Sequence, residues 1–363
     1  MPIYMDLHDL PDGITAKDIA EMHQEDLKIE HKYNCRGLTY WCDERRRTAF
    51  CLMEAPSEQA VIDLHQKAHG AIPQRILEVN EAIVESFLGR IQDPVKSQNT
   101  SLNIINDSAF RTLMVVSLKK KVLRNKEFET LNAAIRGYHK SISNIVSNHN
   151  GRIVKEKSNT YLMSFDSVTN AIQSAIKIPE IHNCVITPDL EFKIGISAGI
   201  PVTKKESIFE DTIKRATNLA LISKEKVCIS NEVKDLYESE NQNNSIPNEI
   251  DSLNVQEEKF VAQLMEYTED NWSHSNMTVS DFQKSLGYSK SKLYRTMMAI
   301  LGKSPNSFLK EYRLNEALQL LDKQNSNISE IAYKTGFSSP AYFSKCFQER
   351  YGVLPSKYSK QIA

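Results

Sequence analysis

The feature that most constrains this chain is a segment near its C-terminal end that occurs twice. The two copies begin at Gly287 and Gly336, 49 residues apart, and each continues with an aromatic residue, a serine and, further on, a second glycine and a proline. Helix-capping residues precede each copy, at 278–281 and 327–330. A helix, a turn closed by a glycine suited to the left-handed conformation and a second helix make a helix-turn-helix unit. The sequence therefore predicts two such units.

The stretch between the copies predicts a rigid connection. Ser304 and Pro305 favour the start of a helix, and apolar residues at helical spacing continue to about Asp322. A helix of about seventeen residues spans roughly 26 Å. Since one face of DNA presents a major groove about every 34 Å, the two units can reach successive grooves.

Four phrases in this region resemble the DNA-binding domain of the AraC/XylS transcription regulators. They occupy residues 313–317, 331–337, 342–347 and 351–355, and read RLNEA, IAYKTGF, YFSKCF and YGVLP. The resemblance covers about 259–363. It implies an all-α domain with two helix-turn-helix units and double-stranded DNA as the partner.

The first residues of each second helix are expected to face the major groove. They are Lys290, Ser291, Lys292 and Arg295 in the first unit and Ser339, Pro340, Tyr342 and Lys345 in the second. Arginine can bond guanine with two hydrogen bonds, whereas lysine and serine more often contact phosphate. The spacing places Leu293, Tyr294, Met297, Phe343 and Phe347 in the core. The alternative is a charged helix face that only contacts solvent.

Charge and composition agree with a nucleic-acid partner. The net charge is −1, but from Lys259 onward fourteen Lys and Arg oppose nine Asp and Glu, a balance that favours phosphate contact. The sequence shows neither an apolar run long enough for a membrane span nor a signal peptide, so we expect a cytoplasmic protein without a membrane partner. The six cysteines form no CxxC pair and are expected to be free thiols.

Two polar stretches, 92–108 and 238–256, predict linkers and divide the chain into three. We expect a multidomain α+β protein with domains at 1–90, 110–237 and 257–363. In the first, strand and helix patterns alternate in the order βαββαβ, which is typical of a ferredoxin-like fold. Residues 3–8 open it as a half-buried strand whose apolar and polar residues alternate.

Histidine is concentrated in this first domain, which holds five of the chain's nine. His65 and His69 are four residues apart on one predicted helix, so their rings can share a metal ion. His23 and His8 are the next candidates. Further candidate ligands are Asp6, Glu54, Cys42 and Cys51. Imidazole with carboxylate or thiolate suits a borderline ion such as nickel or zinc.

Three phrases, at 38–43, 49–56 and 65–70, resemble a small nickel-binding ferredoxin-like family. The resemblance covers about 1–80. It implies a site for nickel or another divalent transition metal and a homodimer, with His65 and His69 as the residues carried over most directly. The alternative is that these histidines are structural residues in a domain that has lost its metal.

The middle domain alternates strands and helices, which indicates an α/β sandwich. Phrases at 150–155, 163–167, 193–199 and 227–230 resemble the class III nucleotide cyclases. The family's two metal-binding aspartates are missing, because Ser117 and Ser158–Asn159 stand in their places, and the helix that carries transition-state residues offers Lys214, Arg215 and Asn218. The resemblance implies a degenerate domain kept for dimerisation or ligand binding. An unrelated α/β domain is the alternative.

The leading hypothesis is a sequence-specific transcription regulator whose N-terminal domains sense a metal or another ligand. It is not expected to be an enzyme. Two other classes of function compete with it. One is a cyclase-type enzyme fused to DNA-binding helices, which the missing aspartates argue against. The other is a metal-storage protein in which the DNA-binding domain is secondary.

Overall fold

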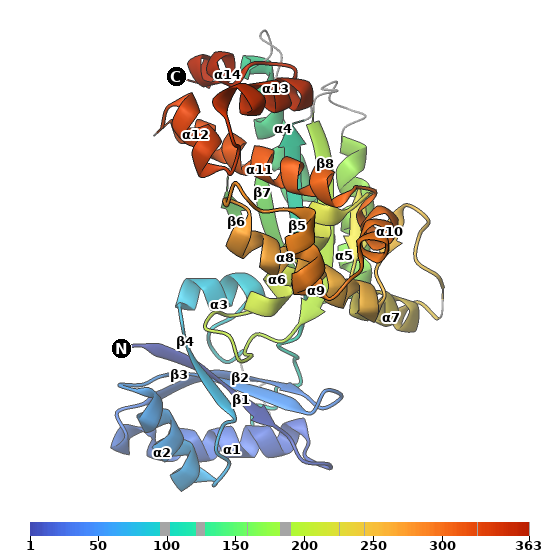
Figure 1. Ribbon diagram of the computed structural model, residues 1–363. Coiled ribbons are helices and arrows are strands. Elements are labelled where there is room, and N and C mark those ends of the chain that lie inside the picture. The colour runs from blue at the N-terminus through green and yellow to red at the C-terminus, as the bar shows by residue number, and fades with distance from the viewer. Residues whose placement is uncertain are drawn as a thin grey trace.

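The computed structural model describes residues 1–94, 102–120, 128–157, 159–181, 190–224, 226–242, 244–324 and 326–362. The chain is a mixed α/β protein with an N-terminal sheet, a second sheet in the middle and a helical C-terminal unit (Figure 1). No helix within these ranges is long and apolar enough to cross a membrane.

The N-terminal sheet is antiparallel, with the strand order β2-β3-β1-β4. Its elements are β1 (Ile3–Asp9), α1 (Ala16–Ile29), a 3-10 turn (Glu30–Lys32), β2 (Arg36–Asp43), β3 (Thr48–Glu54), α2 (Glu58–Ala68), β4 (Arg75–Val79) and α3 (Glu81–Leu88). The element order βαββαβ that the sequence predicts is present. The alternation along β1 is also present: Asp6 reaches α2, whereas Met5 faces the opposite core.

The middle sheet has six strands in the order β10-β9-β8-β5-β7-β6. Its elements are β5 (Arg111–Lys120), α4 (Phe128–Asn148), β6 (Gly151–Lys157), β7 (Thr160–Phe165), α5 (Val168–Glu180), β8 (Leu190–Gly199), α6 (Glu210–Ile222), β9 (Val227–Ile229), α7 (Asn231–Glu240) and β10 (Ile250–Ser252). Its strands β8-β5-β7-β6 repeat the order β4-β1-β3-β2 of the first sheet. At β8, α6 approaches so closely that a Cβ atom on Gly195 would overlap the carbonyl oxygen of Ala216.

Both stretches that predict linkers contain packed residues. Part of the first, 95–101, lies outside the described residues, but Ile105 is buried beside α1, and the backbone oxygen of Asp107 accepts a hydrogen bond from Cys42 N at 2.9 Å. In the second, β10 pairs in parallel with β9. These parts of the chain are therefore not free linkers.

The three units are joined by two hydrophobic cores. The face of the first sheet opposite α1 and α2 packs with α3 and with residues of the middle unit, among them Val202 and Phe209 (Figure 1). Leu219 and Ile222, at the other end of α6, pack with the first helices of the C-terminal unit. The helix α6 therefore contacts both cores: its N-terminal end contributes Ile213 to the first.

The C-terminal unit is all-helical. Its elements are α8 (Val255–Asn271), α9 (Val279–Leu286), α10 (Lys290–Leu301), α11 (Pro305–Asp322), α12 (Ile328–Lys334), α13 (Pro340–Tyr351) and α14 (Pro355–Ile362). The turns that follow α9 and α12 contain Gly287 and Gly336 with φ of 69° and 75°, as the repeat predicts. The predicted capping residues Thr278 and Asn327 both cap their helices.

The connecting helix α11 begins where the sequence predicts, and its cap provides a test. The side chain of Ser304 accepts a hydrogen bond from Ser307 N at 3.3 Å. Because an N-cap satisfies a backbone N–H that has no partner within the helix, Ser304→Ala is expected to lower the free energy of unfolding by about 1 kcal/mol. Urea titration measures this change. Ser307→Ala, which keeps the capping hydroxyl, is the control, and an equal loss in both variants would contradict the role of the cap.

Candidate metal centre and nucleic-acid interface

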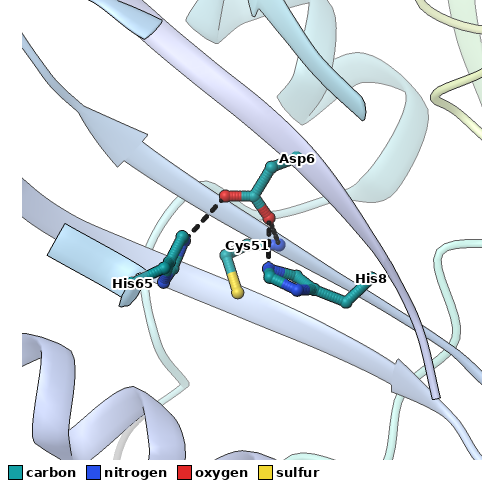
Figure 2. Close-up of side chains that lie close together, drawn as sticks. All are labelled: Asp6, His8, Cys51 and His65. Carbon is teal, nitrogen blue, oxygen red and sulfur yellow. Dashed lines mark hydrogen bonds and ion pairs between the residues drawn. The ribbon is translucent and has the colours of Figure 1, made fainter. Parts of the chain in front are cut away.

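Two groups of metal-ligating side chains lie between the first sheet and its helices. The first comprises Asp6 and His8 of β1, Cys51 of β3 and His65 of α2 (Figure 2). His65 Nε2 lies 2.9 Å from Asp6 Oδ2, and His8 Nε2 lies 3.2 Å from Asp6 Oδ1. All four residues are buried. Within the group, one candidate ligand atom from each residue lies within 4.8 Å of the others.

The second group shares the ring of His65 with the first. His65 Nδ1 lies 3.2 Å from Asp26 of α1, and His69 Nε2 lies 3.3 Å from Asp26 Oδ1. The two imidazoles also approach each other, with 3.2 Å between His65 Nδ1 and His69 Nε2. His65 therefore stands between two buried carboxylates, and its substitution affects both groups.

Burial and charge oppose each other in this cluster. Burial disfavours the charged form of His65, but the charge of Asp6 and the hydrogen bonds that the ring donates to both carboxylates raise the pKa of His65 to about 10. Burial by itself raises the pKa of Asp6, yet the charges of His65 and His8 hold that pKa well below its usual range. Burial also raises the pKa of the Cys51 thiol, and the charge of Asp6 adds to this effect.

The donor set fits a borderline divalent metal ion. It offers imidazole nitrogens, carboxylate oxygens and a thiol in one buried place, the combination that nickel or zinc accepts. The Nε2 atom of His8 is buried and has no hydrogen bond of good geometry to any described residue, despite its distance of 3.2 Å from Asp6. This nitrogen faces the Asp6 carboxylate without a well-aligned hydrogen bond, which makes it a candidate metal ligand.

The structure brings together three of the four histidines that the sequence selects: His8, His65 and His69. His23 is buried elsewhere, where its Nε2 lies 3.5 Å from Asp93 Oδ2 and its ring packs against Tyr40. The predicted contribution of His23 to a metal site has no support in this arrangement.

Two other candidate metal ligands also lie apart from the two groups, and one residue of the second group was not predicted from the sequence. Glu54 pairs with Arg36, and Cys42 belongs to the core beneath α1. Asp26 was not selected from the sequence. The sequence feature that could have identified Asp26 is its position, because it places a carboxylate on the buried face of α1, seven residues after Ile19.

The predicted DNA-contact residues lie at the start of α10 and α13. Ser289 and Ser339 cap these helices, each accepting a hydrogen bond from the backbone three residues on. All the predicted residues that follow these caps are exposed or partly exposed: Lys290, Ser291, Lys292, Arg295, Pro340, Tyr342 and Lys345. The helix starts thus present donors to solvent, as groove contact requires.

The opposite faces of these helices form the core, with one exception. Leu293, Met297, Phe343 and Phe347 are fully buried, as their spacing predicts. The prediction for Tyr294 is wrong, because half of its side chain is exposed. Tyr294 precedes Arg295 in the chain and lies one turn after Lys290 on α10, so it borders the same exposed face.

The middle unit holds the far end of α10. The ammonium group of Lys224 donates a hydrogen bond to the backbone oxygen of Ala299, in the last turn of that helix. A cation at this position also interacts favourably with the helix dipole. The orientation of the first helix-turn-helix unit is therefore tied to the middle unit.

Two family models match the chain. Residues 4–79 match the nickel responsive protein SCO4226-like family, and residues 283–361 match a helix-turn-helix domain family. SCO4226 from Streptomyces coelicolor A3(2) is 36% identical over 21% of this chain and 94% of that chain, with a TM-score of 0.20.

One relative matches almost the whole chain, and another matches about a quarter of it. Histidine kinase P4 of Formosa agariphila is 25% identical over 96% of this chain, which spans only 24% of that protein's length. The uncharacterized HTH-type transcriptional regulator YdeC of Bacillus subtilis is 33% identical over 25% of this chain and 32% of its own length. The chain thus carries a domain of the SCO4226-like nickel-responsive family at its N-terminal end and an AraC-type helix-turn-helix domain at its C-terminal end.

Proposed function

We propose that this protein is a sequence-specific DNA-binding transcription regulator controlled by nickel or another divalent transition metal. The observation that carries the proposal is the pair of capped helices α10 and α13, whose exposed starts lie within an AraC-type domain. Lys290, Ser291, Lys292 and Arg295, with Ser339, Pro340, Tyr342 and Lys345, are the proposed DNA contacts.

The proposed metal ligands are the side chains that already converge on His65. Asp6, His8 and Cys51 would complete one site with His65, whereas Asp26 and His69 would complete the other. A bound ion would supply a positive charge that holds carboxylate and imidazole in one fixed arrangement. The family match and the buried His8 nitrogen support this assignment.

The proposed route from the metal site to DNA runs through β1 and α6. Asp6 and His8 lie on one face of β1, and Met5 lies on the other, in the core shared with the middle unit. That core reaches Phe209 at the start of α6, and Leu219 near its end packs with the DNA-binding helices. A change of β1 on metal binding would thereby favour one arrangement of the helix-turn-helix units.

Finer features are part of the same proposal. We assign domains to 1–90, 110–237 and 257–363, with a ferredoxin-like fold in the first and a degenerate cyclase-like fold in the second. The repeated strand order supports a common core in both. A homodimer acting in the cytoplasm, without enzymatic turnover, completes the proposal. Ser117, where a cyclase would hold a metal-binding aspartate, argues against catalysis, and Ser158 of the second position lies outside the described residues.

Selection from a library of random DNA duplexes tests the DNA-binding part. Full-length protein is expected to enrich a sequence with two contacted motifs, one for each helix-turn-helix unit, about one helical turn or 10–10.5 base pairs apart. A selection that enriches nothing over the starting library would contradict the proposal.

A further inference from the structure

A large cavity lies where the three units meet. It measures about 730 Å³, within the roughly 300–1,000 Å³ typical of small-molecule sites. Arg46 and Thr48 line it from the first unit, α6 from the middle unit, and Ala262 and Glu266 of α8 from the C-terminal unit. We call it the junction cavity. It is separate from the metal groups, none of whose residues line it.

A row of polar side chains on α6 faces the junction cavity. Thr212, Arg215 and Asn218 follow at intervals of three residues and so lie along one side of the helix. Thr212 and Asn218 are only 2% and 6% exposed. The side-chain amide of Asn218 makes no hydrogen bond within the part of the chain that the structure describes, and it is not among the fully buried polar groups there. The amide is therefore open to the cavity, where a ligand can bond it.

Arg215 is the central residue of the row. Its Nη2 atom donates to the backbone oxygen of Ala198 at 3.0 Å, and no acidic side chain among the described residues forms an ion pair with it. Since a guanidinium has five N–H donors, several remain available to a ligand. Arg215 also lines two smaller cavities, of about 370 and 230 Å³, beside α6 and α8.

Four cationic side chains line the cavity, against three acidic ones: Arg46, Lys205, Lys214 and Arg215 against Asp211, Glu232 and Glu266. Arg46 forms an ion pair with Asp43, and Lys214 forms one with Glu269. Lys205 and Arg215 form none with the described residues, so these two cations are the ones that can bind an anion. Asp211 accepts a hydrogen bond from the Thr203 hydroxyl at 2.9 Å, which partly satisfies that carboxylate. Carboxylate and phosphate groups match the forked donors of arginine, and an amide can add a further donor.

We propose that the junction cavity binds a small molecule bearing a carboxylate or phosphate group, held by Arg215 and Asn218. This ligand would be a second effector beside the metal, in contact with all three units. Only its effect on transcription rests on the proposed function. Binding is measured on the protein alone, so failure of one proposal is distinguishable from failure of the other.

Isothermal titration calorimetry of the full-length protein tests the site. Inorganic pyrophosphate and citrate are the two probes, and at least one is expected to bind to a single saturable site. Binding by pyrophosphate alone assigns a phosphate ligand, and binding by citrate alone assigns a carboxylate ligand. Arg215→Ala is expected to weaken binding at least about tenfold, since a charge-assisted hydrogen bond is lost. Asn218→Ala is expected to weaken it less.

Two further variants test whether a loss of binding is specific to the guanidinium group of Arg215. Lys204→Ala removes an exposed positive charge near the cavity that does not line it, and is expected to bind as the wild type does. Arg215→Lys keeps the charge but loses the fork, and is expected to bind more weakly than the wild type even if Arg215→Ala fails to fold. Absence of binding by both probes, or an equal loss in Lys204→Ala and the Arg215 variants, would overturn the proposal.

Discussion

Replacing His65 by alanine is expected to destabilise the metal-free protein by about 3–5 kcal/mol, the usual cost of removing one partner of a buried ion pair. The imidazole lies 2.9 Å from one oxygen of Asp6 and 3.2 Å from Asp26. Without it, two buried carboxylates lose their main positively charged neighbour. Urea denaturation in the presence of a chelator measures the loss. A loss below about 1 kcal/mol in the free energy of unfolding would contradict a stabilising role for the ion pairs of His65.

The same substitution is expected to lower nickel affinity by more than about a hundredfold, because His65 belongs to both ligand groups and loss of outer-shell partners alone costs 10–100-fold. His31→Ala is the matched control, since this ring is exposed and belongs to neither group. His8→Ala and His69→Ala each remove a candidate ligand from one group only. Whichever of the His8 and His69 variants loses more affinity identifies the group that binds the ion. Full affinity in the His65, His8 and His69 variants would contradict a metal site here.

Arg295→Ala is expected to weaken binding to the selected DNA sequence between about tenfold and a hundredfold, while non-specific binding changes little. The reason is that arginine in the major groove bonds a guanine through two hydrogen bonds, worth about 1–3 kcal/mol of discrimination. Arg295 is exposed on α10, one turn beyond the capped helix start. Fluorescence anisotropy with the selected duplex and with a scrambled one measures both affinities at fixed salt.

A matched control separates groove contact from general charge. Lys323, at the end of α11, is exposed on the same unit and is not among the predicted contacts. Lys323→Ala is expected to leave the specific affinity within about twofold of the wild type. Equal losses on both duplexes for Arg295→Ala would instead identify Arg295 as a phosphate contact.

Much of the structure could be predicted from local sequence patterns, because the features concerned depend only on neighbouring residues. The alternation along β1 fixes which residues face α1 and α2, and it places Asp6 and His8 on the same side. The glycine repeat predicted both helix-turn-helix turns, and Ser304–Pro305 predicted the start of α11. These features follow from backbone geometry within a few residues.

The differences between prediction and structure arise where distant segments decide the environment of a residue. His23 and Asp26 lie on the same buried stripe of α1, but only contact with α2 brings Asp26 to the metal groups. Residues 250–252 were predicted to belong to a linker because three residues are too few to show the pattern of a strand. They form a strand by pairing with β9. Tyr294 follows the apolar residue Leu293 but falls on the solvent side of α10.

The affinity of the full-length protein for its selected DNA sequence, measured with nickel sulfate and with chelator, decides whether the metal controls DNA binding. We predict that stoichiometric nickel changes this affinity at least about fivefold, the lower range of allosteric coupling. We also predict that His65→Ala abolishes the difference while Arg295→Ala lowers both affinities. Tight, sequence-specific binding of equal affinity with and without nickel in the wild type would contradict the proposed metal control.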